Sequence, residues 1–207
     1  DHRDLHSFPT RRSSDLICAQ NNFSIELKGV KTLAHVSNEL SYWNDGVGGE
    51  IGAKYSLTAN ISTNLSFGYS EYHYSGKGLD RVMFPEARAI YAGEKTKMIT
   101  LTLGMSLKPG EAFISPSFAI AFGGYSLNIG SVWMDVYDMQ NVFIYQSRDE
   151  DTGKTISGLM FNISVGFSLN LIEGLGLNIM AGYLDLLNRN NNLFPISAGI
   201  EYRVPSF

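Results

Sequence analysis

The stretch LMFNISVGFSLN, from Leu159 to Asn170, alternates large apolar side chains with small or polar ones. The odd-numbered positions hold Leu, Phe, Ile, Val, Phe and Leu, and the even-numbered positions after Met160 hold Asn, Ser, Gly, Ser and Asn. Successive side chains of a β-strand point to opposite faces of the sheet. The period of two therefore predicts a long strand with one apolar face and one small, polar face.

The same alternation recurs along the rest of the chain, and no segment of comparable length has the spacing of an amphipathic helix. Eight strands are predicted in all, and the fold class is therefore all-β. The other seven are Phe23–Leu27, Ile51–Leu57, Leu65–Tyr69, Ile99–Leu107, Ile114–Phe122, Leu175–Tyr183 and Ile196–Val204.

The connections between these strands alternate between short and long. Tight turns are predicted at Ala59–Thr63, Lys108–Glu111 and Leu171–Gly174, where Pro109-Gly110 and Glu173-Gly174 are turn signals. This layout predicts a closed, eight-stranded, antiparallel up-and-down barrel with the short turns and both termini at one end. The long polar loops then share the other end, and they are Val30–Gly49, Gly76–Lys95, Asn128–Lys154 and Leu186–Leu193.

Composition excludes several other classes of protein. The chain has 207 residues, 16 Lys and Arg against 20 Asp and Glu, and a single cysteine. This weak acidity argues against nucleic-acid binding, and one cysteine excludes an internal disulfide or a cysteine-cluster zinc site. The chain contains no run of about 18 apolar residues, so no transmembrane helix is predicted. We predict no metal site and no cofactor.

The beginning of the chain is predicted not to belong to the barrel. Residues 1–16, DHRDLHSFPTRRSSDL, match an in-frame translation of a common sequencing adapter at all sixteen positions. Residues 17–19, Ile-Cys-Ala, are interpreted as the remnant of a secretory signal peptide, with Ala19 before the cleavage point. One barrel domain is then expected over residues 20–207.

The apolar rows are predicted to face outward, toward lipid. Rows of about 9–11 residues match the length that a tilted strand needs to cross a ~30 Å hydrocarbon core. The opposite rows are small enough to fill the lumen of an eight-stranded barrel. The alternative is a soluble, lipocalin-like barrel whose apolar residues surround a ligand. The predicted lipid-facing residues are Leu103, Phe118, Phe161, Val165, Ile179 and Ile200, and the predicted aromatic girdles contain Tyr55, Tyr69, Tyr125, Tyr183, Phe194 and Tyr202.

The chain resembles the small outer-membrane β-barrels of Gram-negative bacteria, close in plan to the OmpA- and OmpX-type barrels. The resemblance covers Asn22–Phe207 and is carried by the eight alternating rows, the last strand GIEYRV and the terminal Phe207. It implies a monomer in the outer membrane, with periplasmic termini and extracellular loops. It also implies contact with outer-membrane lipid and lipopolysaccharide, and insertion by the barrel assembly machinery.

Charged residues are predicted inside the barrel where its first and last strands meet. The alternation of side chains directs three acidic and three basic residues into the lumen. Charged groups buried there need partners of opposite charge. We therefore hypothesise an ion-paired polar plug rather than an open channel; in the alternative, these charges lie near solvated strand ends. The six residues are Glu26, Lys28, Glu50, Lys54, Glu201 and Arg203.

Two features suggest more specific activities. His73 and Ser75 form a His-x-Ser pair, which resembles that of outer-membrane lipid A deacylases, so a small lipid-modifying barrel enzyme is the alternative function. Because most pairs with this spacing are accidental, we predict no catalytic residue. The loop 128–154 carries Trp133, Tyr137, Phe143 and Tyr145, which are predicted to form a hairpin that could bind an extracellular partner. The predicted role is non-enzymatic: structural, adhesive or narrowly porin-like. Cations that could contact lipopolysaccharide phosphates are Arg81, Arg88, Lys95 and Lys97.

Overall fold

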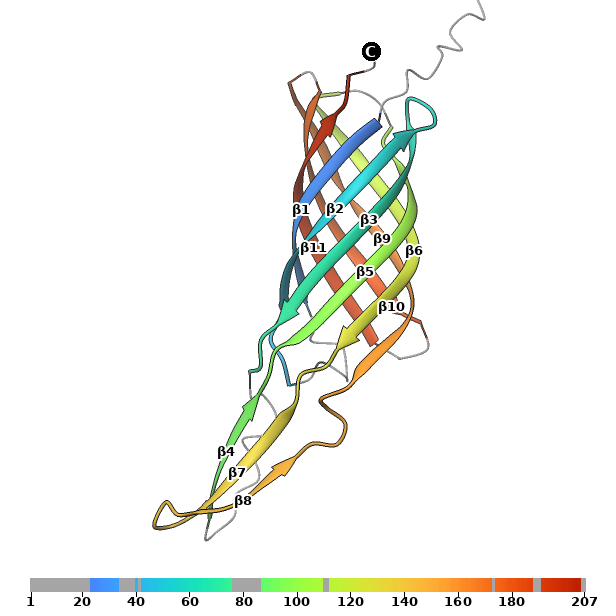
Figure 1. The fold of residues 1–207 in the computed structure, drawn as a ribbon. Coiled ribbons are helices and arrows are strands. Elements are labelled where there is room, and N and C mark those ends of the chain that lie inside the picture. Colours follow the sequence, from blue (N-terminus) through green and yellow to red (C-terminus); the bar gives the residue numbers. More distant parts are fainter. Residues whose placement is uncertain are drawn as a thin grey trace, which may run out of the picture.

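The structure is a computed structural model, and it describes residues 23–33, 40, 42–75, 87–109, 112–172, 174–187 and 191–205. All regular structure in these ranges is β-strand (Figure 1). The adapter-like segment 1–16, the predicted signal remnant 17–19 and Phe207 lie outside the described residues. Nothing in the described ranges is a helix of sufficient length and apolarity to cross a membrane.

Eight strands form a closed barrel in which each strand pairs with its neighbours in chain order. Each strand of the barrel contains one of the eight predicted segments or most of it, so the predicted fold class is confirmed. The strands are β1 (Phe23–Leu33), β2 (Gly46–Ser56), β3 (Ile61–Tyr72), β5 (Thr96–Leu107), β6 (Ile114–Asn128), β9 (Thr155–Ile172), β10 (Leu175–Leu186) and β11 (Asn191–Arg203).

The seam that closes the barrel is the antiparallel pair of β1 and β11. Its register runs from Ser24 opposite Arg203 to Leu33 opposite Phe194. All barrel pairs are antiparallel, and the tight turns lie at the end of the barrel where β11 ends (Figure 1). The long loops therefore all leave the opposite end.

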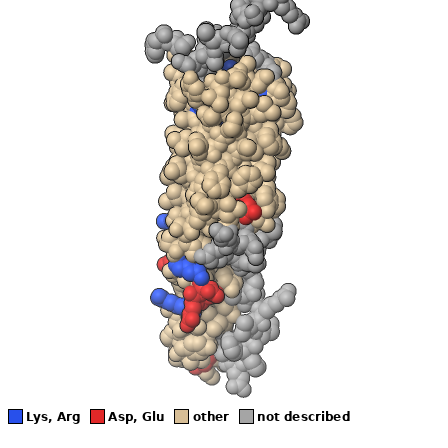
Figure 2. Space-filling view, turned by 90° about the vertical axis from the view of Figure 1, so that its right-hand side faces the viewer, with Lys and Arg blue, Asp and Glu red and all other residues tan. Residues whose placement is uncertain are grey.

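The large apolar side chains face away from the barrel axis, as the period of two predicts. Leu103 is 65% exposed, Val165 55% and Ile200 54%, although each lies in the middle of a strand. Phe118 and Ile179 are also exposed, and half-buried Phe161 lies opposite exposed Phe122 in the ladder. Figure 2 shows a wall almost free of charge over most of the barrel. A lipocalin-like barrel would have these residues inside, so the structure does not support that alternative.

The placement of Tyr125 in an aromatic girdle is wrong. Its side chain is only 4% exposed, and it lies opposite Thr100, a residue of the lumen wall. The apolar row of β6 occupies even positions up to Phe122, and the strand continues without a bulge to Asn128. Odd-numbered Tyr125 therefore points inward, over Gly158. The other five predicted girdle aromatics are exposed: Tyr55, Tyr69, Tyr183, Phe194 and Tyr202.

Three further strands form a separate sheet that projects beyond the loop end of the barrel (Figure 1). They are β4 (Ala87–Gly93), β7 (Val132–Asp138) and β8 (Phe143–Arg148), in the order β4-β7-β8. The hairpin expected in loop 128–154 is thus present as β7 and β8. β4 comes from the loop 76–95 and was not predicted.

An apolar core occupies the lumen at the loop end. Inward-facing side chains of β3, β5, β6, β9, β10 and β11 pack there with Leu40 and Trp43 of the first long loop. The expectation of a lumen filled by small and polar residues therefore holds only for the part nearer the tight turns. We call this core the apolar plug; it consists of Leu40, Trp43, Tyr72, Met98, Tyr125, Leu127, Ile129, Val132, Ile156, Met160, Leu184, Leu186 and Leu193.

Candidate functional site

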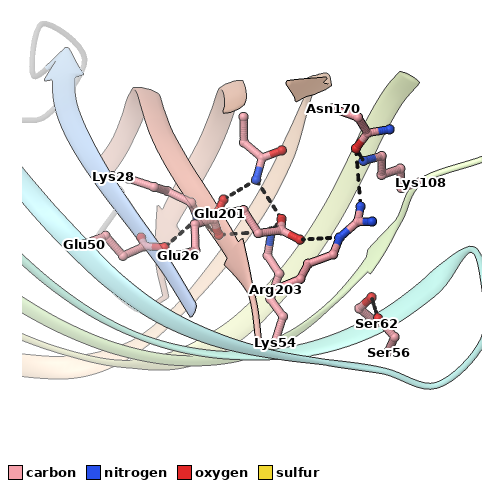
Figure 3. A network of polar contacts seen from close by, with 11 residues as sticks. Glu26, Lys28, Glu50, Lys54, Ser56, Ser62, Lys108, Asn170, Glu201 and Arg203 are labelled. Carbon is pink, nitrogen blue, oxygen red and sulfur yellow. Dashed lines mark hydrogen bonds and ion pairs between the residues drawn. The ribbon is translucent and has the colours of Figure 1, made fainter. Parts of the chain in front are cut away.

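The charged residues predicted for the lumen lie in one connected network near the tight turns (Figure 3). Lys28 Nζ lies 3.0 Å from Glu26 Oε2 and 2.7 Å from Glu50 Oε1. Lys54 Nζ lies 3.1 Å from Glu26 Oε2. The structure thus brings these four predicted residues together on two adjacent strands, β1 and β2.

The network also crosses the seam between β1 and β11. Glu26 and Glu201 lie directly opposite each other across this seam, an arrangement that is repulsive for two carboxylates. Lys54 of β2 reaches over β1 and places its Nζ 2.8 Å from Glu201 Oε2. One lysine therefore bridges both carboxylates.

An asparagine that sequence reasoning missed makes the second bridge. The Nδ2 group of Asn178, on β10, donates to Glu26 Oε1 at 2.6 Å and to Glu201 Oε2 at 2.9 Å. An uncharged amide gives no signal in a search for ion pairs. Its inward parity on β10, two strands from Glu26, was the available clue.

Arg203 extends the network toward the tight turns. Its Nε lies 3.9 Å from Glu201 Oε1, and its guanidinium donates to Asn170 Oδ1 at 3.3 Å. Lys108 donates to the same oxygen at 2.8 Å (Figure 3). With three acids and three bases among the predicted six, the charges balance, as burial in a barrel requires.

A polar cavity of about 100 Å³ lies in the lumen beside the ion network, and it extends to Met98, Met160 and Leu184 of the apolar plug. Ser66 and Thr102 share a 2.7 Å hydrogen bond in its wall. The side-chain oxygens of Asn64 and Asn162 are buried without a hydrogen-bond partner among the described residues. The lumen is therefore lined by charged and polar side chains toward the tight turns and by apolar side chains at its loop end.

A bonded neck joins the projecting sheet to the barrel. Glu94 N donates to Ser131 O at 2.8 Å, and Gly130 N donates to Thr96 Oγ1 at 2.9 Å. A Cβ atom at Gly130 would lie 2.4 Å from Glu94 O, so this close crossing requires glycine. Trp43 Nε1 donates to Glu94 O at 2.8 Å and so ties the first long loop to the neck.

The same loop contacts the acidic turn that follows β8. The Tyr42 hydroxyl donates a hydrogen bond to the Asp149 carboxylate. Burial and this neighbouring negative charge both raise the pKa of Tyr42. Asp149 N donates to Val132 O at 3.0 Å, which fixes this turn to β7. The projecting sheet is therefore held at its base by several connections rather than by one flexible hinge.

The projecting sheet presents β8 as an exposed edge strand. Among the described strands β8 pairs only with β7, and each of its six residues is exposed. Phe143, Ile144 and Tyr145 are 53%, 52% and 45% exposed. The predicted aromatics Tyr137 and Phe143 pack edge to face, with ring centroids 5.8 Å apart. Of the two other predicted aromatics, Trp133 is half-buried and Tyr145 is exposed.

The other candidate groups are placed as follows. The Ser75 hydroxyl donates to Tyr42 O at 3.1 Å, so its proton is directed to a backbone carbonyl. Lys95 pairs with Glu71 at 3.1 Å on the outer wall, and exposed Lys97 lies opposite Glu71 in the ladder. Arg81 and the side chain of Arg88 lie outside the described residues. Within the described ranges, no three His, Cys, Asp or Glu side chains gather in a way that could hold a metal ion.

Comparison with known proteins supports the architecture. Neisserial surface protein A is 10% identical with a TM-score of 0.50, over 88% of this chain and 96% of that protein. The chain has the fold of a small eight-stranded outer-membrane β-barrel. OprG of Pseudomonas aeruginosa is 12% identical with a TM-score of 0.49, over 90% of this chain and 98% of its own.

The attachment invasion locus protein Ail of Yersinia pestis is 11% identical with a TM-score of 0.48, over 89% of this chain and 97% of its own. No family model and no curated protein matches the sequence. At these identities the likeness extends to the fold alone.

Proposed function

We propose that the protein is an integral monomer of the outer membrane that displays the projecting sheet outside the cell to bind a partner. The exposed edge strand β8, held on a closed barrel, is the observation that carries this proposal. Unpaired edge strands are uncommon on soluble surfaces because they pair with other chains, and several recognition modules use them to bind extended peptides. The proposed role is non-enzymatic.

The outward apolar rows support the membrane location. Strands of 11–18 residues with apolar outer faces satisfy every backbone group within the barrel, which is what a hydrocarbon environment requires. We expect the protein to fractionate with outer membranes and to need detergent for extraction. Its band on a gel should shift when the sample is heated. Recovery in aqueous extract without detergent would overturn the location.

The closed lumen supports display rather than transport. The ion network occupies the lumen near the tight turns, and the apolar plug packs across its loop end. We expect the refolded protein to be electrically silent in planar bilayers. Stable single-channel currents would favour the narrow porin-like role instead.

Removal of β7 and β8 tests the display role directly. A variant that lacks residues 132–151 should insert and show heat-modifiable migration like the full chain. Cells that carry it should lose the attachment to surfaces or matrix proteins that the full chain confers. Equal attachment by both forms would refute the role of the sheet.

Lipopolysaccharide is the proposed partner of the outer wall at its loop end. Lys95 and Lys97 lie at the border of the apolar band, where lipid phosphates are expected, but Glu71 neutralises part of their charge. Replacement of both lysines by Gln should weaken co-purification of lipopolysaccharide without changing the barrel. The barrel assembly machinery is the proposed route of insertion, so depletion of that machinery should reduce the amount of folded protein.

A further inference from the structure

We infer that the β8 edge binds an extended peptide segment with an apolar centre and basic residues at both ends. This inference rests on the proposed function, because it names the kind of partner that the displayed edge takes. Three properties of β8 carry it: a backbone edge that no other described strand pairs with, exposed apolar side chains, and carboxylates at both of its ends.

The exposed surface at the centre of β8 fits an added β-strand better than a helix. Ile144 is an extra residue in β8, because Tyr145 lies opposite Val136 and Phe143 opposite Tyr137. Phe143 therefore packs on Tyr137 on one face and Tyr145 lies on the other, so apolar surface is exposed on both faces. A helix contacts a surface from one side only. A strand added to the edge forms main-chain hydrogen bonds and places alternate side chains beside both faces at once.

Carboxylates lie at both ends of this edge. Asp138 precedes β8 at the tip of the hairpin, where its Oδ1 accepts from Gln140 N at 2.9 Å and from Val142 N at 2.8 Å. Asp149, Glu150 and Asp151 follow β8 at its base, and the side chain of Asp151 is 95% exposed. Residues 132–154 contain five acids and two bases, Arg148 and Lys154, and Lys154 pairs with Asp151 at 3.3 Å. The acids therefore remain in excess.

This charge distribution decides between the available occupants. A second copy of the chain would bring the same carboxylates together along the shared edge, and like charges in an interface oppose association. A polyanion such as a sulfated sugar would meet the same repulsion. A partner strand with lysine or arginine at both ends would meet opposite charge at each end and apolar surface between.

The neck makes the edge suited to strand addition. Hydrogen bonds from Gly130, Ser131 and Val132 fix the chain where it enters β7, and β7 in turn pairs with β8. A preformed edge loses little conformational freedom on binding, which favours affinity.

Peptide binding to the full chain in lipid nanodiscs tests the inference. The probes are a fluorescent Val/Thr-alternating peptide with two Lys at each end, the same peptide with Glu in place of Lys, and the Lys peptide with a central Pro. We expect the Lys peptide to bind about tenfold or more tightly than either of the others, with affinity falling as salt rises. Equal or tighter binding of the Glu peptide would overturn the inference.

Two matched variants check the site of binding. Glu150→Gln combined with Asp151→Asn should weaken the Lys peptide several-fold, whereas Glu71→Gln on the barrel wall should leave its binding unchanged. If no peptide binds but removal of residues 132–151 still abolishes cell attachment, the basic-strand inference fails while the display role stands. If that removal leaves attachment intact, both fail.

Discussion

At the seam between β1 and β11, one lysine offsets the repulsion between two carboxylates that lie opposite each other. Glu26 and Glu201 are opposite in register, and Lys54 lies within 3.1 Å and 2.8 Å of them. We expect Lys54→Met to destabilise the barrel by about 3–5 kcal/mol, because it leaves buried carboxylates without this cation. Urea unfolding of the refolded protein in lipid vesicles measures the loss.

Lys95→Met is the matched control for this prediction. Lys95 also pairs with a glutamate, but its side chain is 51% exposed, so its loss should cost less than about 1 kcal/mol. Equal effects of the two substitutions would show that Lys54 is not needed to separate the seam carboxylates.

An inward glycine allows two strands to approach closely at another position. A Cβ atom at Gly166 would lie 1.9 Å from Ile179 O, and this backbone atom cannot move without a shift of the ladder. We expect Gly166→Ala to destabilise the barrel by about 1–3 kcal/mol, the usual cost of overpacking. At outward-facing Gly29 the nearest atom to such a Cβ is 3.9 Å away, so Gly29→Ala should be close to neutral in the same urea assay.

At this scale strand parity predicts which residues point inward but not how they meet. The six charged residues could be placed in the lumen from parity and chain order alone. The role of Asn178 could not be foreseen, because it depends on a reach across β11 that only the closed register defines. The girdle prediction for Tyr125 is wrong because its odd parity on β6 turns this aromatic ring into the lumen.

The projecting sheet and the barrel are separable elements of the fold. β6 and β9 remain paired up to Asn128 opposite Thr155, and Ile129 N still donates to Lys154 O at 2.8 Å beyond that point. Replacement of residues 130–153 by a short Asn-Gly turn should therefore leave the barrel closed. We expect heat-modifiable migration to be retained, with a loss of unfolding free energy limited to the contacts of Val132, the neck hydrogen bonds of Gly130 and Ser131, and the contact of Tyr42 with Asp149. A variant that no longer refolds would show that the sheet is required for closure.

The apolar plug is expected to be the main barrier to ions. An apolar constriction excludes water and hence ions, whereas a charged network can stay hydrated. Leu127 and Leu186 are fully buried in the plug, so Leu127→Ser with Leu186→Ser should allow ion flux across planar bilayers. Removal of the opposed pair, by Lys28→Met with Glu50→Gln, should leave the bilayer silent. The reverse pattern would assign the barrier to the ion network.

The barrel strands were predictable as elements because lipid on one side and a crowded lumen on the other impose a strict period of two. β4 was not, because ARAIYAG carries no such alternation and pairs with β7 through contacts that loop geometry decides. The apolar plug was missed for a related reason. Its members are inward residues near the strand ends, such as Leu184, Leu186 and Leu193, which interrupt the polar row only where the loops fold over it.

For the whole molecule, the asymmetry of the two ends determines how the chain must sit in a membrane for the proposed function. Among the described residues, one end of the barrel has the tight turns, and the other carries the projecting sheet (Figure 1). A displayed edge strand binds an external partner only if the sheet end faces outward, which places the turn between β2 and β3 on the periplasmic side. The proposed display, partner binding and lipopolysaccharide contact all require this orientation.

Cysteine labelling of intact cells tests this orientation with two exposed positions at opposite ends of the molecule. Glu150 lies in the acidic turn after β8, and Ala59 lies in the tight turn between β2 and β3. In a Cys18→Ser background, a membrane-impermeant maleimide should label Glu150→Cys on intact cells. The same reagent should label Ala59→Cys only after the outer membrane is permeabilised. Labelling of Ala59→Cys alone on intact cells would invert the molecule and remove the basis for partner display.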